Sequence, residues 1–279
     1  MELLKVEKLN VFIDKEKLID NGTFAVSSGD VILLTGPNGC GKSTIIKLIM
    51  GDIFDYKNLS YDASVLFRGE HDIVHSEAEN EHFRKHVCYI SQEDIFETDS
   101  VLDCFLMAVN YDIKKNKEQY IYDFILKYDI QDCWGFDDDL KLDSKARRLA
   151  SKLNLDAKSI SGKKAVKYLS MNIKRMSGGQ KKLTNIVTNL IRYEFSDIIL
   201  LDEPLNNLDY NNVRAFSNIL TKIYRSKPEL GIIVVTHCRS LPIVNRMIEI
   251  DMKTKGLKEC KNYSCSACFG DYDENGFYK

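Results

Sequence analysis

The spacing of hydrophobic and polar positions predicts an α/β protein. Near the N-terminus, short apolar runs alternate with polar positions, which is typical of antiparallel strands. Three later runs, at residues 31–35, 198–201 and 231–236, are continuously apolar over the length of a strand. Continuous runs of this kind indicate strands buried on both faces, as in a parallel sheet.

Helical periodicity fills the intervals between these runs. Apolar residues recur at i, i+3, i+4 and i+7 from Ile121 to Tyr128, and again from Ala146 to Leu153. Strand signals are scarce between about residues 100 and 176, and we therefore expect a helical insertion over about 93–176. Apolar stripes after it predict helices over 183–191 and 213–223, so that strands and helices alternate as in a parallel α/β sheet. We expect one domain over residues 1–252 and a cysteine-containing tail over 253–279.

Composition narrows the class of protein. The chain has 279 residues and a mass of 32.1 kDa, and 44% of its residues are hydrophobic, which excludes a wholly disordered chain. Its net charge of −2 creates no overall field that would recruit nucleic acid or membrane. Neither a membrane-spanning run nor an apolar secretory segment is visible in the sequence. We therefore expect a cytoplasmic protein whose eight cysteines are free thiols.

A phosphate-binding loop joins the first buried run to a helical pattern. It fits the pattern G-x-x-x-x-G-K-[ST], and its residues are Gly36, Pro37, Asn38, Gly39, Cys40, Gly41, Lys42, Ser43 and Thr44. Glycines let successive backbone N–H groups converge on phosphate oxygens, and the following helix points its positive end at the same anion. Lys42 supplies charge to the β- and γ-phosphates, and Ser43 supplies a hydroxyl for Mg²⁺. Cys40 is either a small spacer or a reactive thiol beside Lys42.

Two carboxylates follow the second buried run. Asp202 and Glu203 come directly after residues 198–201, where the carboxyl end of a parallel strand faces the ligand crevice. Asp202 is suited to hold Mg²⁺, and Glu203 is suited to polarise an attacking water. The alternative, a solvated surface turn, explains the four preceding aliphatic residues less well.

A further set of motifs resembles the ATP-binding cassette (ABC) family. Its signature is usually LSGGQ, and this chain has Met176 followed by Ser177, Gly178, Gly179 and Gln180. Gln92 is similar to the glutamine of the family's Q-loop, residues 205–209 are similar to its D-loop, and His237 is similar to its switch histidine. Six motifs in the family's order span most of residues 31–240, which is far more specific than a phosphate loop alone.

The resemblance implies a P-loop NTPase of ABC type. It implies a RecA-like parallel-sheet core, an N-terminal antiparallel β subdomain and an enlarged helical subdomain. Glu203 would act as general base, Lys42 and His237 would contact the γ-phosphate, and Ser43, Asp202 and Gln92 would serve the magnesium ion and the attacking water. Residues 177–180 and Asp209 would bind ATP held by a second subunit, so that the chain would act as a homodimer or as a heterodimer with another ABC subunit.

Three positions depart from the family's usual pattern. The family commonly stacks adenine on an aromatic residue about thirty positions before the loop lysine; here Phe12 is the candidate, with Ile13 one position on. A transporter subunit commonly has Arg where this chain has Leu183, and the D-loop contains Asn206 and Asn207. These changes leave ATP binding intact and weaken the inference to an ordinary transporter.

Local charge is separated along the chain. Residues 145–182 contain twelve Lys and Arg against Asp156 alone, whereas residues 70–103 contain ten acids against two bases. The basic segment is either a solvated face or a docking surface for nucleic acid, the ribosome or an acidic effector protein. The 85-residue interval from Gln92 to Ser177 is long for a transporter-type member of the family.

The C-terminal tail and the biological role leave alternatives open. Cys260, Cys265 and Cys268 have part of a zinc-site spacing, although they are equally compatible with plain thiols and lack a fourth ligand nearby. The favoured role is the ATP-binding subunit of a transporter, working at the inner face of the membrane with a permease on a separate chain. The alternative is a soluble ABC ATPase acting on nucleic acid, the ribosome or an effector protein in stress or defence.

Overall fold

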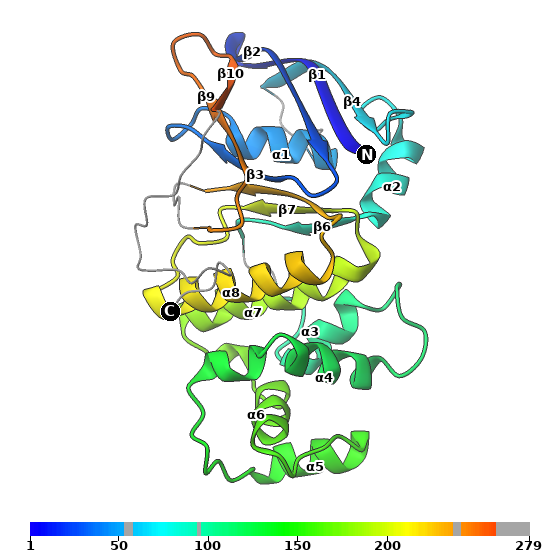
Figure 1. The fold of residues 1–279 in the computed structure, drawn as a ribbon, viewed down its shortest axis with the longest axis vertical. Coiled ribbons are helices and arrows are strands. Elements are labelled where there is room, and N and C mark those ends of the chain that lie inside the picture. The colour runs from blue at the N-terminus through cyan, green and yellow to red at the C-terminus, as the bar shows by residue number, and fades with distance from the viewer. Residues whose placement is uncertain (53–57, 94–95, 237–240, 261–279) are drawn as a thin grey trace. The chain divides into compact units, whose positions relative to one another are not determined.

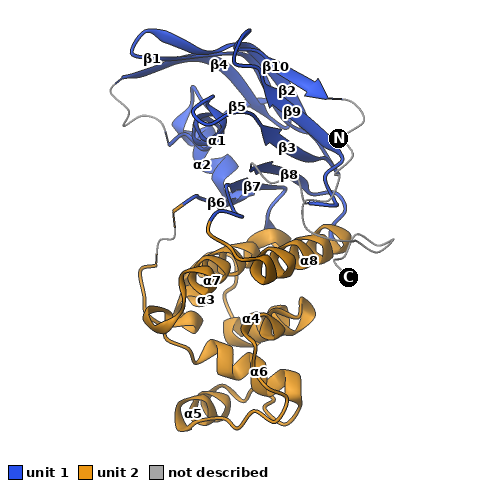
Figure 2. Ribbon diagram, turned by 90° about the vertical axis from the view of Figure 1, so that its left-hand side faces the viewer, with its two compact units in different colours: residues 1–92, 195–206, 227–272 blue, residues 93–194, 207–226, 273–279 orange. Residues whose placement is uncertain are grey.

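The chain folds into two compact units. The computed structural model describes residues 1–52, 58–93, 96–236 and 241–260 (Figure 1). Figure 2 shows unit 1 in blue and unit 2 in orange. Unit 1 comprises residues 1–92, 195–206 and 227–272, and unit 2 comprises residues 93–194, 207–226 and 273–279.

An antiparallel sheet forms one layer of unit 1. Its strand order is β2-β1-β4-β5, and its members are β1 (Glu2–Ile13), β2 (Glu16–Ser27), β4 (Leu59–Phe67) and β5 (His71–Asp72). Leu4 and Val6 of β1 are fully buried, whereas Lys5 and Glu7 are only partly buried, as the alternating pattern predicts for a strand with one core face. The expected N-terminal antiparallel subdomain is therefore confirmed.

A mainly parallel sheet forms the second layer. Its order is β10-β9-β3-β8-β7-β6, and only β10 runs antiparallel to its neighbour. Its strands are β3 (Val31–Thr35), β6 (Val87–Ile90), β7 (Ile198–Asp202), β8 (Gly231–Val235), β9 (Arg246–Ile250) and β10 (Leu257–Cys260). Every residue of β3, β7 and β8 is buried, which confirms that the three continuous apolar runs are interior strands.

Two helices complete unit 1. They are α1 (Lys42–Met50) and α2 (Glu77–Lys85). The apolar residues of α1, such as Ile45 and Ile49, join a single core with Val65 of the antiparallel sheet and Ile32 of the parallel sheet. This core fixes the end of β3 and the start of α1, which are the two anchors of the phosphate loop.

Unit 2 is helical. Its elements are α3 (Val101–Ala108), α4 (Lys117–Lys127), η1 (Ile130–Trp134), α5 (Ser144–Leu153), α6 (Ile160–Leu169), η2 (Ile173–Arg175), α7 (Gly178–Leu190), η3 (Ile191–Phe195) and α8 (Tyr210–Ser226). The compact unit is wider than the expected insertion, because it also contains α7 and α8. Trp134 stacks on the buried Tyr168 with ring centroids 4.3 Å apart. Nowhere in the described parts of the chain is a helix both long and apolar enough to cross a bilayer.

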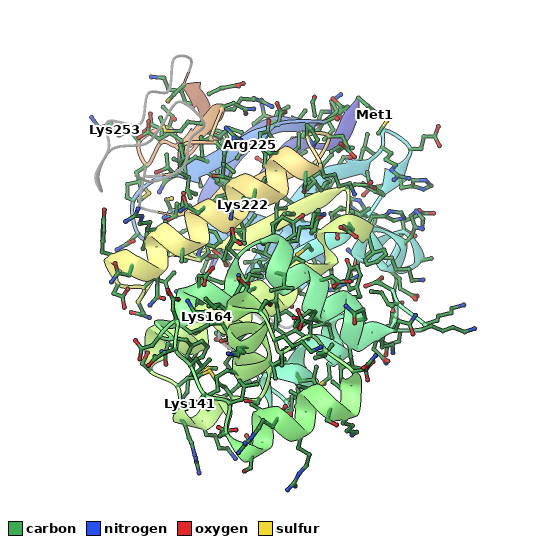
Figure 3. All side chains as sticks on the ribbon, turned by 60° about the horizontal axis from the view of Figure 1, so that its bottom comes forward. Met1, Lys141, Lys164, Lys222, Arg225 and Lys253 are labelled. Atoms are coloured by element: carbon green, nitrogen blue, oxygen red, sulfur yellow. The ribbon has the colours of Figure 1, made fainter. Side chains whose placement is uncertain are left out.

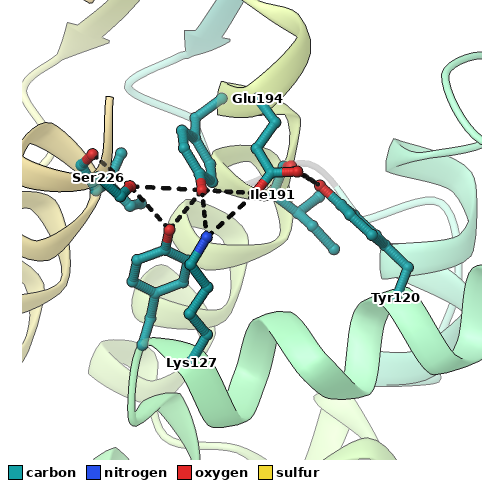
Figure 4. Close-up of polar contacts among 8 residues, drawn as sticks. Tyr120, Lys127, Ile191, Glu194 and Ser226 are labelled. Carbon is teal, nitrogen blue, oxygen red and sulfur yellow. Dashed lines mark hydrogen bonds and ion pairs between the residues drawn. The ribbon is translucent and has the colours of Figure 1, made fainter. Parts of the chain in front are cut away.

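A polar network ties α4 to η3 and α8 inside unit 2 (Figure 4). The hydroxyl of buried Tyr193 accepts a hydrogen bond from Lys127 Nζ at 3.1 Å and donates one to Glu194 Oε1 at 2.7 Å. Tyr128 and Ser226 extend the network to α8. Burial raises the pKa of Glu194, but hydrogen bonds from Tyr193, Tyr120 and Lys127 outweigh it and hold that pKa below its ordinary value. The network therefore holds a charged carboxylate and a charged amine against the helical core.

Removing the central hydroxyl should destabilise unit 2. We expect Tyr193→Phe to lower the free energy of unfolding by about 1–3 kcal/mol, because buried Tyr128 and the charged groups of Lys127 and Glu194 each lose one hydrogen bond. Urea denaturation followed by circular dichroism measures the change. Tyr111→Phe is the matched control, since Tyr111 is 91% exposed. Equal unfolding free energies for the two variants would contradict this account.

Candidate nucleotide-binding site

The loop between β3 and α1 has a backbone that only glycine adopts easily. Gly41, the N-cap of α1, has φ 105°, and Gly39 has φ 77°. A Cβ on Gly41 would lie 2.9 Å from Leu18 Cδ2, so the loop also needs glycine there for space. The loop consequently closes against β2 with its backbone turned toward the start of α1.

Lys42 is a buried cation inside this loop. Its side chain is nearly inaccessible, and its Nζ donates hydrogen bonds to Gly36 O and Pro37 O, both at 3.0 Å. Among the described residues no carboxylate pairs with this ammonium. A charge removed from water needs compensation, and two carbonyl dipoles supply only part of it. The loop is therefore suited to bind an anion, with its cation already in position.

Ser43 and Asp202 stand side by side at the carboxyl ends of the parallel strands. Ser43 Oγ donates to Asp202 Oδ1 at 2.9 Å, and Asp202 is 1% exposed at the end of β7. A hydroxyl and a carboxylate are hard oxygen ligands of the kind that Mg²⁺ prefers. The donor set therefore fits a magnesium ion beside the loop.

Glu203 follows with a backbone that non-glycine residues rarely adopt. Its φ is 49°, and its N–H donates to Val235 O of β8 at 2.8 Å. The side chain is 5% exposed. A residue held in this region by the surrounding sheet carries a small conformational cost, a feature concentrated at functional sites.

Lys42, Ser43 and Glu203 line one cavity of about 620 Å³ within unit 1. Gln92, predicted from a separate motif, lines the same cavity, whereas Asp202 lies outside the lining and reaches it through Ser43. The complete lining is Ile13, Leu18, Asn38, Gly39, Gly41, Lys42, Ser43, Thr44, Gln92, Glu203 and Asn206. Leu18 was not anticipated from the sequence, which gave no motif for it, whereas Asn206 belongs to the predicted D-loop.

The apolar side of this cavity differs from the expected one. Ile13 and Leu18 line it, whereas Phe12 is absent from the lining and lies beneath Lys17, whose Nζ is 5.4 Å from the ring centroid. Neighbouring residues of a strand point to opposite faces, so only one of Phe12 and Ile13 can face the loop. The geometry favours Ile13.

Cys40 fills space beneath the loop. It is fully buried, and a Cβ on Gly36 would lie 2.7 Å from its sulfur. Burial raises the pKa of the Cys40 thiol, although Lys42 acts in the opposite direction. Of the two interpretations left open by the sequence, these observations favour the inert spacer.

The signature residues begin α7 in unit 2. Ser177 is the N-cap, its Oγ accepts from Gln180 N at 3.2 Å, and Gln180 Oε1 accepts from Ser177 N at 3.1 Å, which completes a capping box. The first amides of a helix have no intrahelical acceptor, and Gly178 has open space where a Cβ would be. The start of α7 therefore offers a second anion-binding surface.

Asp209 ties the D-loop to the signature. Its two carboxylate oxygens accept from Asn212 N at 2.9 Å and from Asn212 Nδ2 at 3.0 Å. A Cβ on Gly179 would lie 2.8 Å from that Nδ2, so the glycine allows α8 to approach α7 closely. Ser177, Gln180 and Asp209 line a shared hollow of about 770 Å³ in unit 2. Asn212 was missed, although Asp followed three residues later by Asn is a recognisable helix start.

Two groups of predicted residues lie outside the described ranges. His237 is one, and Cys265 with Cys268 is the other. Cys260 is described and ends β10, where its sulfur is 3.9 Å from Glu249 Oε2. Within the ranges given above, no three His, Cys, Asp or Glu side chains are grouped to hold a metal ion.

Comparison with known proteins gives a consistent result. The chain is 23% identical over 235 residues to the probable iron export ATP-binding protein FetA of Escherichia coli, covering 84% of each chain. It is 25% identical over 242 residues to the zinc uptake system ATP-binding protein ZurA of Listeria monocytogenes, covering 85% of this chain and 77% of ZurA. It is also 26% identical over 258 residues to the uncharacterized ABC transporter ATP-binding protein YfmR of Bacillus subtilis, covering 90% of this chain but only 36% of YfmR.

Solved structures share the fold. One is an ATP-binding subunit of an ABC transporter, with a TM-score of 0.65 at 17% identity, covering 93% of this chain and 90% of that one. Another is cbiO1 of Clostridium perfringens, part of the transporter complex cbiONQ, with a TM-score of 0.64 at 19% identity, covering 92% and 87%. These likenesses confirm the predicted ABC-type α/β fold. The sequence model of the ABC transporter family matches residues 19–206, about two thirds of the chain, and the chain therefore belongs to the ABC transporter family.

Proposed function

We propose that the protein is the ATP-binding, ATP-hydrolysing subunit of an ABC transporter and that it works as a pair of ABC subunits. The observation that carries the proposal is the buried Lys42 ammonium, which has two carbonyl partners and no counter-charge among the described residues, beside the Ser43–Asp202 pair. Triphosphate oxygens would supply the missing negative charge. Ser43 and Asp202 would hold Mg²⁺, which when bound would supply positive charge to the β- and γ-phosphates.

Side chains around the same cavity would carry out ATP hydrolysis. Glu203 would take a proton from the attacking water, Gln92 would orient that water, and His237 would contact the γ-phosphate. The backbone of Glu203 is held at the end of β7 by the bond from its N–H to β8, which fixes the point from which its carboxylate reaches into the cavity. Ile13 and Leu18 offer an apolar surface for the adenine ring.

Pairing follows from the division of the motifs. Unit 1 carries the phosphate loop with Asp202 and Glu203, whereas unit 2 carries the signature and Asp209. In the proposed dimer each chain binds ATP at its loop and presents residues 177–180 to the ATP of its partner. The partner subunit is a second copy or another ABC chain, and closure of the pair around ATP would drive a separate membrane permease. This role places the protein in the cytoplasm, at the inner face of the membrane.

A transport role is supported by the relatives, whose names describe iron export and zinc uptake by those proteins.

One observation favours a second candidate, a non-transport ABC ATPase acting on another macromolecule: α5 carries exposed cations that have no ion pair with any acid in the described part of the chain. A zinc site at Cys260, Cys265 and Cys268 remains a separate prediction, to be tested by metal analysis of the purified protein.

Lys42→Ala tests the phosphate site. We expect ATP affinity to fall by about 10- to 100-fold, because a charged hydrogen-bond donor to phosphate is lost. Isothermal titration calorimetry with Mg-ATP measures the change. Lys5→Ala, which removes an exposed lysine of unit 1 paired with Glu7, is the control and should bind ATP normally. Unchanged affinity in Lys42→Ala would contradict the assignment of the loop.

Glu203→Gln tests the catalytic base. We expect ATP to remain bound while phosphate release falls about 100-fold or more, because the amide cannot accept the proton of the attacking water. Phosphate release and nucleotide retention are measured on the same preparation. Glu229→Gln changes an exposed glutamate of unit 1 and should hydrolyse ATP at the parental rate. Parental turnover in Glu203→Gln would show that another group is the base.

A further inference from the structure

Helix α5 exposes an unusual amount of positive charge. Only Ala146 and Ala150 of this helix are buried, and Asp143 caps its start by accepting from Ala146 N at 2.8 Å. Residues 140–163, which contain α5 and its flanks, include seven Lys and Arg against two Asp. The cations are Lys141, Lys145, Arg147, Arg148, Lys152, Lys158 and Lys163 (Figure 3, where Lys141 is labelled).

These cations differ from six other cations of unit 2 that have acidic partners. Neighbouring ones are neutralised: Lys164 pairs with Asp138 at 2.7 Å, and Lys167 pairs with Asp143 at 2.5 Å. Lys174, Arg192 and Lys127 also have acidic partners. None of the seven cations of residues 140–163 has an ion pair with any described acid, and the second aspartate, Asp156, accepts from backbone and hydroxyl groups instead. The positive charge of this surface is therefore uncompensated within the described chain.

Three of the cations surround an apolar groove. The groove has a volume of about 200 Å³ and lies where the start of α3 and the end of α6 meet α5. Leucines line its interior, and Lys145, Arg148 and Lys152 stand at its α5 side. The leucines are Leu102, Leu149 and Leu169, and Ser100 and Ser170 complete the lining. The apolar floor can accept an apolar side chain, and the three unpaired cations beside it can pair with carboxylates. This surface therefore complements an acidic, amphipathic peptide.

We propose that the α5 groove binds an acidic amphipathic segment of a partner protein. One large apolar side chain of that segment would enter the groove, and neighbouring carboxylates would pair with Lys145, Arg148 and Lys152. The volume suits a side chain better than a whole small-molecule ligand, whose pockets measure about 300–1,000 Å³. The surface lies entirely within unit 2, so this inference goes beyond the ATP site and does not depend on it.

Nucleic acid fits the groove less well. A phosphate backbone would pair with the cations but would leave the leucine floor without an apolar partner. The lining residues include no aromatic ring on which a base could stack. An acidic peptide satisfies both the charge and the apolar floor.

The probe is a synthetic 16-residue helical peptide with leucines at i and i+4 flanked by glutamates, labelled with fluorescein and titrated with the full chain. A second peptide carries serine at the leucine positions and keeps the charge, and a 20-nucleotide single strand tests the other class of polyanion. The groove variant combines Lys145→Glu, Arg148→Glu and Lys152→Glu. The matched control combines Lys141→Glu, Arg147→Glu and Lys158→Glu, which changes net charge equally but touches no lining residue.

We expect the leucine peptide to bind and the groove variant to weaken it by about tenfold or more, because three charge pairs become repulsive. The control variant should weaken it less than threefold, and the serine peptide should bind at least tenfold more weakly than the leucine peptide. Circular dichroism verifies that both variants are folded.

Three results would overturn the proposal. The first is no saturable binding of the leucine peptide up to about 1 mM. The second is equal binding of the leucine and serine peptides, which would show that the apolar floor plays no part. The third is tighter binding of the oligonucleotide than of the leucine peptide with equal losses in both triple variants, which would indicate a general surface for nucleic acid.

Discussion

The ammonium of Lys42 is a cation enclosed by the backbone of its own loop, and its only partners among the described residues are two carbonyl oxygens. Burying a charge is costly unless an opposite charge arrives, so the folded chain keeps a strong demand for an anion at this point. The rest of unit 1 meets the geometric needs of that arrangement. Fully buried β3 fixes the start of the loop, the apolar face of α1 fixes its end, and Gly39 and Gly41 supply the backbone angles between them.

The second predicted phosphate-binding element, the signature at the start of α7, lies in unit 2. The start of α7 presents helix amides, and the capping box between Ser177 and Gln180 holds that terminus in shape. The hydrogen bond between Asp209 and Asn212 holds the Asn212 amide close to Gly179, where α8 packs on α7. Because one chain has a single phosphate loop and a single signature, the proposed dimer would contain two complete composite sites. The same division leaves the α5 surface of unit 2 available for a different partner.

Much of the fold of unit 1 could be predicted from the sequence, because its strands and its phosphate loop each have a recognisable pattern within a few consecutive residues. Buried strands appear as uninterrupted aliphatic runs, so β3, β7 and β8 were identified correctly. The phosphate-loop motif needs particular residues at fixed spacings, and residues 36–44 follow β3 and run into α1, as the motif predicts. The sequence could not predict which residue lines the apolar side of the cavity. Phe12 and Ile13 lie where the β1–β2 register shifts, between Val11 and Phe12. A bulge changes which side chain faces the core, and the apolar pattern does not locate it. Likewise, the sequence showed the excess charge after residue 140, but only tertiary contacts separate paired Lys164 and Lys167 from the unpaired cations of α5.

The central claim is that ATP hydrolysis requires the phosphate loop of one chain and the signature of another. The direct measurement mixes two inactive variants, Lys42→Ala and Ser177→Arg, and compares ATPase activity with each variant alone. In a two-fold dimer, random mixing makes half of the dimers mixed, and each mixed dimer regains one of its two sites. The account predicts recovery to roughly a quarter of the parental rate when both sites act independently. No recovery in dimers shown to have mixed, or parental activity in Ser177→Arg alone, would contradict it.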